Sequence, residues 1–341
     1  MRVLVTGGTG FVGGHIAAAA QQAGHDVRLL VRRPEQVPLT LGPLGAHADD
    51  VVIGDVLDED AVDRALKGCD AVVHAAAIFT FDARRAEEVL ATNARAAELI
   101  LTTAAERGLD PVVHISSTVA LTRYGGSGPD LPLGDIELPY ARSKLASEMV
   151  ARRLQDEGAP VVTVYPGAVQ GPNDPYRGVN SEAVRWAARG LLPLYPPGSV
   201  HAVDVRTVGD TVLAVLEPGR GSRRYVVPGV ALDAALLFGT LEQVTGRRLR
   251  YAVAPGSLAL AAARVTELLQ RPLPGRWHYP ADVEVIELAL RDTRFDTRRT
   301  RDELGVEPVP FATTMRDTTR WLVESGRLPA KYAGKALSPQ A

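Results

Sequence analysis

The chain has 341 residues, of which 46% are hydrophobic and 23% are charged. This composition is ordinary for a globular protein and excludes a disordered or collagen-like chain. Lysine and arginine number 38 and aspartate and glutamate 40, for a formal net charge of -2, so no overall basic field exists to attract nucleic acid or an anionic membrane.

The first half of the chain alternates short valine-rich runs with alanine- and leucine-rich amphipathic segments. This alternation predicts βα units and a parallel sheet. Strands are predicted at the N-terminus and over residues 27–31, 51–53, 71–74, 112–116 and 161–165. Helices are predicted over residues 11–23, 59–67, 86–107 and 140–157, each followed by a glycine or ended close to one. Joined by right-handed crossovers, these elements predict an α/β fold with a Rossmann-type doubly wound sheet over residues 1–165.

After Pro166 the periodicity breaks into pieces punctuated by glycine and proline. We therefore expect residues 166–330 to form a smaller, irregular C-terminal lobe that binds the substrate. This lobe is interleaved with the first domain, because residues 202–205 and 224–227 are predicted to be strands that return to the main sheet. Residues 331–341 are expected to be a frayed tail.

A glycine-rich segment, TGGTGFVG at Thr6–Gly13, follows the first strand and opens the first helix. Gly7 permits a tight turn, Gly10 lets backbone N–H groups approach a pyrophosphate, and Gly13 lets the helix lie close to the sheet. Such a loop alone is also compatible with a turn that binds nothing. The strand, loop and helix around it favour dinucleotide binding at the helix N-terminus.

The end of the second strand carries Arg32 and Arg33 where NAD-preferring folds usually place an acidic residue. A guanidinium favours a ribose 2′-phosphate, so the pair predicts NADPH, with NAD less favoured, although two solvated arginines are the alternative. Asp55, followed by Val56, is placed to meet the adenine amino group. The small residues Ala75–Ala77 end the fourth strand and would let the backbone pass beside the cofactor.

Ser117 follows the fifth strand, and Tyr140 and Lys144 lie four residues apart on the next helix, hence on one helix face. A phenol has a reference pKa near 10, which an adjacent ammonium and an oxidised nicotinamide both lower. Ser117 can donate a hydrogen bond to the same substrate oxygen. A Tyr-x-x-x-Lys pair alone is a common helix turn, but after a serine-ended strand and a dinucleotide loop it predicts proton transfer at a C–O centre.

The chain resembles the extended short-chain dehydrogenase/reductase family over nearly its whole length. By that resemblance Tyr140 is the general acid/base, Lys144 orients the nicotinamide ribose, and Ser117 polarises the carbonyl. Asn93 resembles the family's asparagine on the helix before the catalytic strand. The Pro166–Val169 backbone is implied to meet the nicotinamide carboxamide. The motifs that carry the resemblance are Thr6–Gly13, Asp55-Val56, His74–Ala77, Thr92-Asn93, Ser116-Ser117, Tyr140–Lys144, Tyr165-Pro166-Gly167, Gly171-Pro172 and Val203-Asp204-Val205.

The sequence thus assigns cofactor contacts to the glycine loop, the second and third strand ends, the catalytic helix and the Pro166 loop, and it predicts no metal site. The predicted cofactor-binding residues are Gly7, Thr9, Gly10, Phe11, Val12, Gly13, Arg32, Arg33, Asp55, Val56, Ala75, Ala76, Ala77, Tyr140, Lys144, Pro166, Gly167, Ala168 and Val169.

Three positions separate this chain from the family's sugar-nucleotide enzymes. The epimerases carry asparagine where this chain has Ala168, and the dehydratases carry an acidic pair where it has Thr118-Val119. Arg32 is the third departure. The remainder is similar to dihydroflavonol reductases, cinnamoyl-CoA reductases and 3β-hydroxysteroid dehydrogenases, which act on apolar carbonyl compounds or alcohols.

Apolar and aromatic residues after the fourth and fifth strands and beyond Gly171 suggest a pocket of matching character. Several of them are equally compatible with the core. Arg123 and Arg177 are loop residues placed either to meet an acidic substrate group or to be merely solvated. An amphipathic helix over 258–269 is expected to pack against the protein. The predicted substrate-contacting residues are Ile78, Phe79, Thr118, Tyr124, Tyr176 and Trp186.

The sequence therefore predicts an NADPH-dependent oxidoreductase that reduces a ketone or aldehyde of a small, largely apolar substrate, or runs the reverse reaction. A sugar-nucleotide epimerase or dehydratase and a non-catalytic NADP-sensing module are the alternatives. The expected partner is this small molecule, with neither nucleic acid nor a membrane, and a homodimer is left open. One cysteine, Cys69, and no N-terminal apolar run indicate a reducing cytoplasm.

Overall fold

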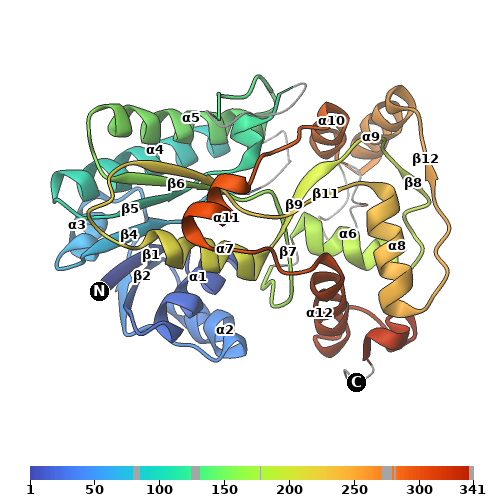
Figure 1. Ribbon diagram of the computed structural model, residues 1–341, viewed down its shortest axis with the longest axis horizontal. Helices are drawn as coiled ribbons and strands as arrows, with labels where there is room; N and C mark the ends of the chain where they lie inside the picture. The colour runs from blue at the N-terminus through green and yellow to red at the C-terminus, as the bar shows by residue number, and fades with distance from the viewer. Residues whose placement is uncertain (80–84, 124–130, 177, 271–278, 280–281, 338–341) are drawn as a thin grey trace.

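The computed structural model describes residues 1–79, 85–123, 131–176, 178–270, 279 and 282–337. Its main sheet has seven strands in the order β10-β6-β5-β4-β1-β2-β3, and every neighbouring pair is parallel (Figure 1). These strands are β1 (Arg2–Thr6), β2 (Asp26–Val31), β3 (Asp50–Ile53), β4 (Ala71–His74), β5 (Val112–Ile115), β6 (Val161–Tyr165) and β10 (Arg223–Val226). The chain order reverses between β1 and β4, which is the switch point where open α/β sheets bind ligands.

Helices cover both faces of this sheet (Figure 1). The first layer is α3 (Glu59–Leu66), α4 (Ala86–Glu106) and α5 (Pro139–Asp156), and the opposite layer is α1 (Phe11–Gln22), α7 (Val205–Val215) and α11 (Arg298–Leu304), with α2 (Val37–Leu41) beside α1. Successive strand residues point to opposite faces, so Val3 and Val5 pack with α1 and α7 while Leu4 packs with α3 and α4. The strands are apolar on both faces because both faces are covered.

A smaller lobe follows β6. It contains a three-stranded sheet of β7 (Ala168–Gln170), β9 (Val200–Asp204) and β11 (Val230–Leu232), and a pair of β8 (Leu194–Tyr195) with β12 (Ala252–Val253). Its helices are α6 (Val179–Ala188), α8 (Ala234–Thr245), α9 (Gly256–Gln270), α10 (Val283–Arg291) and α12 (Phe311–Glu324). Buried Val184, Phe238 and Met315 join α6, α8 and α12 in a second core. The predicted Rossmann-type fold with a smaller C-terminal lobe is confirmed.

Two of the expected elements beyond Pro166 differ from the prediction. Residues 224–226 do supply an edge strand of the main sheet, β10, but residues 202–204 fall in β9, which pairs with β7 and β11 instead, and Val205 begins α7. Residues 331–337 are not frayed: they form short 3-10 turns whose Ala333 and Ala336 are fully buried in the core of the smaller lobe.

The predicted amphipathic helix is α9, and it packs on α10 through only one face. Ala259 and Ala263 are buried there, whereas Leu258, Val265 and Leu269 on the other face are more than half exposed. No helix in the described parts of the chain has both the length and the hydrophobicity that a bilayer span requires.

Candidate functional site

The glycine loop lies at the carboxyl end of β1, at the switch point. Gly7 has a φ of +75°, and a Cβ there would stand 2.7 Å from the backbone nitrogen of Ala76, so only glycine fits. The helix α1 begins after Gly10 without any side-chain cap, which leaves its first backbone N–H groups to an external acceptor. An anion such as a pyrophosphate fits this cradle.

The structure places Gly13 against the glycine loop, whereas the sequence predicted that it faces the sheet. A Cβ at this position would overlap the carbonyl oxygen of Gly7, so the missing side chain lets the helix lie against its own loop rather than against the sheet. The neighbouring predicted residues serve the loop as well: Val12 packs on the core beneath it, and the carbonyl of Thr9 accepts a hydrogen bond from Thr40 at 3.2 Å.

We expect Gly13→Ala to weaken the binding of a nicotinamide dinucleotide, with NADPH as the probe, by roughly tenfold or more, because the loop must shift to admit the methyl group. For the same reason the free energy of unfolding should fall by about 1–3 kcal/mol. Calorimetric titration with NADPH and thermal unfolding measure the two effects. Gly239→Ala is the matched control, since a Cβ on that α8 glycine meets open space. Equal NADPH affinity in both variants would contradict the prediction.

The ends of β2 and β3 bring Arg32 and Asp55 together. Their guanidinium and carboxylate lie 3.7 Å apart, and the Arg32 side chain is 72% exposed. Arg33 is also exposed and precedes a 3-10 turn at Pro34–Gln36. Val56 faces inward and packs under α3. A cation and an acceptor thus stand at the sheet edge where the adenosine end of a dinucleotide would lie.

Hydrogen bonds tie the carboxyl ends of β1 and β4 to each other. The hydroxyl of Thr6 bonds to Nδ1 of His74 at 2.9 Å and accepts the Ala76 N–H at 3.2 Å. Burial lowers the pKa of His74 to about 3, so its ring is neutral at physiological pH. This arrangement fixes the Ala75–Ala77 backbone beside the glycine loop.

Tyr140 and Ser117 meet at the carboxyl end of β5. Tyr140 is the second residue of α5, and its phenol shares a hydrogen bond with Ser117, whose Oγ also accepts the Val119 N–H at 3.2 Å. Phe79 packs edge-on against the phenol ring, with centroids 4.8 Å apart. Burial, and then the negative charge of Glu284, raise the pKa of Tyr140, while the Ser117 hydrogen bond lowers it.

Lys144 lies one turn further along α5 and is 7% exposed. Its ammonium donates to the carbonyl of Ile115 at 3.4 Å, so it is held at the end of β5. Burial lowers the pKa of Lys144 to about 8, against the opposing effect of the Glu148 carboxylate. In the protein alone the pKa of Tyr140 is raised, because burial and Glu284 outweigh the Ser117 hydrogen bond, and the predicted effect of Lys144 together with an oxidised nicotinamide stays a prediction.

Asn93 joins three segments. Its Oδ1 accepts the Ile78 N–H at 2.8 Å, and its amide donates to the Ile78 carbonyl at 3.0 Å and to Ser143 Oγ at 3.2 Å. Asn93 therefore fastens α4 to the end of β4 and to α5 between Tyr140 and Lys144. These contacts describe a positioning residue.

The Pro166–Val169 segment runs beside Ser117. The carbonyl of Pro166 accepts the Thr118 N–H at 2.9 Å, and Ala168 and Val169 open β7. A Cβ on Gly167 would overlap the His201 carbonyl of β9, so glycine lets the two chains meet. The segment thus lies at the boundary between the main sheet and the smaller lobe.

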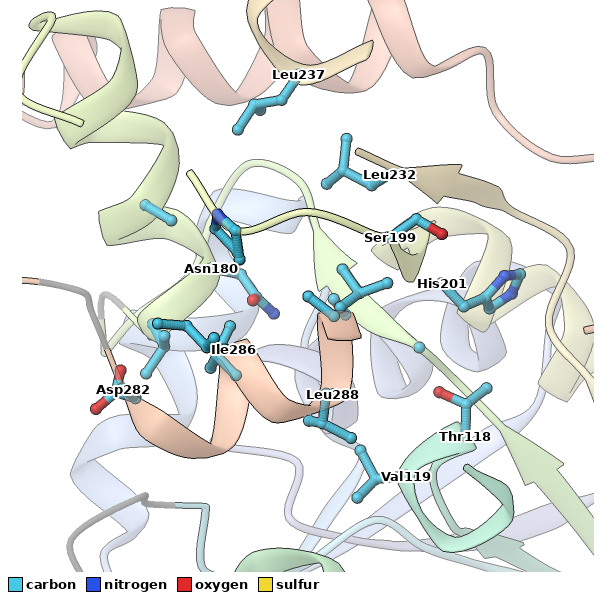
Figure 2. A pocket seen from close by; sticks show the side chains of 18 of the residues that line it. Thr118, Val119, Asn180, Ser199, His201, Leu232, Leu237, Asp282, Ile286 and Leu288 are labelled. Atoms are coloured by element: carbon cyan, nitrogen blue, oxygen red, sulfur yellow. The ribbon is translucent and has the colours of Figure 1, made fainter. Parts of the chain in front are cut away.

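A cavity of about 200 Å³ opens from Ser117 and Tyr140 into the smaller lobe. Figure 2 shows α10 and α6 on its sides, with Asn180, Ser199 and Asp282 as polar side chains around it. Phe79 and Thr118 line it as predicted. Among its described lining residues there is neither arginine nor lysine. The apolar side chains labelled in Figure 2 are Val119, Leu232, Leu237, Ile286 and Leu288.

Three of the predicted substrate residues, Ile78, Tyr176 and Trp186, lie outside the described lining. Ile78 is held by Asn93 outside the described lining, and the Tyr176 hydroxyl donates to Gln36 at 2.8 Å, beside the Arg33 turn. Trp186 packs edge-on at 5.1 Å against Tyr279, which lines the cavity, so Trp186 supports the wall from behind. Arg123 is exposed, and its carbonyl accepts Thr293 Oγ1 at 2.7 Å. Tyr124 and Arg177 lie outside the described residues.

Glu284 is the functional residue that the sequence did not indicate. It stands on α10, and its carboxylate accepts the Ala141 N–H at 2.9 Å and the Tyr140 N–H at 3.5 Å, at the start of the catalytic helix. More than 140 residues separate the two ends of this contact, so no local motif could reveal it.

Comparisons with known proteins show the family of the chain. Residues 3–227 match the NAD dependent epimerase/dehydratase family. Sterol demethylase protein B of Methylococcus capsulatus is 28% identical, over 96% of this chain and 100% of its own length. The putative dihydroflavonol 4-reductase of Synechocystis is 26% identical over 94% of each chain. The crystal structure of gox2253 superposes with a TM-score of 0.80 at 27% identity, over 96% of this chain and 99% of that one.

The predicted branch of the family is confirmed by the names of further relatives. A 3-beta-hydroxysteroid dehydrogenase of Mycolicibacterium neoaurum is 24% identical over 97% of this chain and 96% of its own length. Cinnamoyl-CoA reductase 1 of Petunia hybrida is 25% identical over 96% and 93%.

Proposed function

The chain belongs to the NAD dependent epimerase/dehydratase family of enzymes, and from that premise we propose that it is an NADPH-dependent reductase. Its substrate in this proposal is an uncharged, largely apolar ketone or aldehyde, which it converts to the alcohol. The observation that carries the proposal is the hydrogen-bonded pair of Tyr140 and Ser117 at the end of a cavity whose described lining has no cationic side chain.

The cofactor site is assigned from the chain's own groups. Gly7, Gly10 and the uncapped start of α1 would bind the pyrophosphate, and Arg32 would pair with the 2′-phosphate. When bound, the dihydronicotinamide supplies a hydride to the carbonyl carbon. Its ribose would meet Lys144, which is already fixed at the end of β5.

Tyr140 and Ser117 handle the oxygen of the substrate. Tyr140 stays protonated at neutral pH, because burial and the charge of Glu284 raise its pKa, so it is ready to donate its proton as the carbonyl is reduced. Ser117 stabilises the negative charge that develops on the same oxygen. The positive charge of Lys144 lies in the same buried region. There it stabilises the phenolate that Tyr140 becomes after donating its proton.

The lining of the cavity supports an uncharged substrate. A diphosphate or carboxylate buried among Val119, Leu232 and Ile286 would lose its hydration without gaining a cation among the described lining residues. Asp282 is the one acidic side chain among the described lining residues. A sugar nucleotide is disfavoured for the same reason.

The decisive assay follows NADPH absorbance with tetralone, cinnamaldehyde and a matched pair of ketones, para-methylacetophenone and para-acetylbenzoate. The pair differs mainly in charge, and we expect the methyl compound to be preferred roughly tenfold or more in kcat/KM because its counterpart must bury an unpaired carboxylate. NADH and the Tyr140→Phe enzyme serve as controls.

A preference for para-acetylbenzoate would contradict the assignment of an uncharged substrate. If the protein converts UDP-glucose and releases NAD when it is denatured, it is an epimerase and not a reductase. Tight NADPH binding without turnover of any of these carbonyl compounds would instead favour a sensing module.

A further inference from the structure

The catalytic helix α5 begins without a capping group of its own. Leu138, which precedes it, offers no side-chain hydrogen bond to the first turn. The acceptor comes instead from the smaller lobe: Glu284 binds the N–H groups of Tyr140 and Ala141 through its two carboxylate oxygens, at 3.5 and 2.9 Å. A carboxylate at this place also faces the positive end of the helix dipole.

Glu284 is buried in an acidic neighbourhood. It is 5% exposed, and its described hydrogen bonds go to these two backbone donors alone. Among the described residues, the charged groups that act on it are Asp282, two residues earlier at the N-cap of α10, and Glu267 of the packed helix α9. Glu267 itself accepts the Val283 N–H at 2.9 Å. Burial raises the pKa of Glu284 to about 7, the two N–H donors oppose this shift, and the two acids reinforce it.

The same carboxylate acts on the phenol of Tyr140. Its negative charge raises the pKa of the phenol and is the second largest cause after burial. Carbonyl reduction begins with protonated Tyr140, whereas alcohol oxidation needs the phenolate as the base. A carboxylate charge at the start of the catalytic helix therefore affects which protonation form of Tyr140 is present at a given pH.

We propose that Glu284 is a positioning residue that fixes the start of the catalytic helix through the N–H groups of Tyr140 and Ala141 and controls the proton transfer of Tyr140. This inference rests on the proposed function. In reduction, the hydride forms a C–H bond with the carbonyl carbon, and the C=O π bond breaks. Its electron pair stays on the oxygen and takes the proton of Tyr140. The O–H pair stays on the phenolate, which water reprotonates, and oxidation runs the same steps backwards.

Glu284→Gln separates charge from capping, because the amide oxygen still accepts the Ala141 N–H. Glu242→Gln is the matched control: that carboxylate also accepts a backbone N–H, from Leu249 at 2.6 Å, but on α8 and away from Tyr140. Glu284→Ala removes charge and cap together. Thermal unfolding of each variant establishes that it is folded.

The first readout needs no substrate. Tyrosinate absorbance is titrated with NADP+ bound, and the Tyr140→Phe titration is subtracted, which isolates the phenol of Tyr140. We expect the midpoint to fall by about one pH unit in Glu284→Gln and in Glu284→Ala, and to stay in place in Glu242→Gln. An unchanged midpoint in folded Glu284→Gln overturns the proposal.

The second readout is the pH profile of kcat for tetralol oxidation, with tetralone reduction measured beside it. The rise of this kcat with pH follows ionisation of Tyr140, and its midpoint should lie about one pH unit lower in Glu284→Gln than in wild type. A profile equal to wild type overturns the effect of Glu284 on proton transfer. If wild type turns over neither compound, the proposed function fails, and the absorbance titration still decides the effect of Glu284 on Tyr140.

Discussion

Tyr140→Phe is expected to lower kcat for ketone reduction roughly a thousandfold, since a positioned general acid contributes about 10²–10⁴-fold. The variant loses only the phenolic hydroxyl, and with it the hydrogen bond to Ser117 and the donated proton. The edge contact of the ring with Phe79 remains, so the cavity keeps its shape. We expect the Kd of NADPH to change by less than about threefold.

Stopped-flow mixing of the enzyme and NADPH with tetralone measures the loss directly. Tyr225→Phe is the control, because it also deletes a buried tyrosine hydroxyl, one that donates to Glu303 at 2.7 Å on the far edge strand β10. Its kcat should remain near the wild-type value. Near wild-type turnover by Tyr140→Phe would remove this residue from the chemistry and leave Ser117 or water as the acid.

Arg32→Asp is expected to lower kcat/KM with NADPH roughly a hundredfold. A hydrogen bond to a charged group contributes about 1.5–3 kcal/mol, and every 1.4 kcal/mol is a factor of ten. The new carboxylate also stands beside Asp55, now 3.7 Å from the guanidinium, and so adds repulsion against a 2′-phosphate. With NADH the same carboxylate can accept the ribose hydroxyl, so kcat/KM with NADH should rise.

The ratio of the two kcat/KM values, measured with one ketone, gives the result without knowledge of the natural substrate. Arg32→Lys keeps the charge but loses the two-pronged geometry, and it should fall between wild type and Arg32→Asp. A ratio that is the same in all three enzymes would show that Arg32 does not contact the cofactor. Arg33 would then be the remaining candidate for the contact with the 2′-phosphate.

The sequence predicted the sheet well because its signals are local. Valine runs between glycine-ended helices placed β4 and β6 at their observed bounds, and the motif order identified the loop at Gly7 and the pair Tyr140 and Lys144. The long gap between the pair and Ser117 was bridged by the place of Ser117 at the end of the fifth strand, and the family resemblance then implied its role. The structure then brought Ser117 to the phenol through a short 3-10 turn.

The smaller lobe was predicted less well because its contacts are distant in sequence. Strand β9 resembles any other valine-containing strand, and only its pairing with β7 and β11 takes it out of the main sheet. Tyr176 looked like a pocket residue because it is aromatic and follows Gly171, yet it bonds to Gln36. The raised pKa of Tyr140 in the protein alone could not be predicted because its largest causes, burial and Glu284, exist only in the folded chain.

The cap supplied by Glu284 has a consequence for synthesis on the ribosome. Chains emerge from the N-terminus, and domains fold as they appear. The residues of β1 to β6 and α5 are made before those of α10, so the catalytic helix exists first without the carboxylate that holds its N-terminus. A partly translated chain can thus form strands β1 to β6 while the start of α5 still lacks its carboxylate partner, which arrives only with α10.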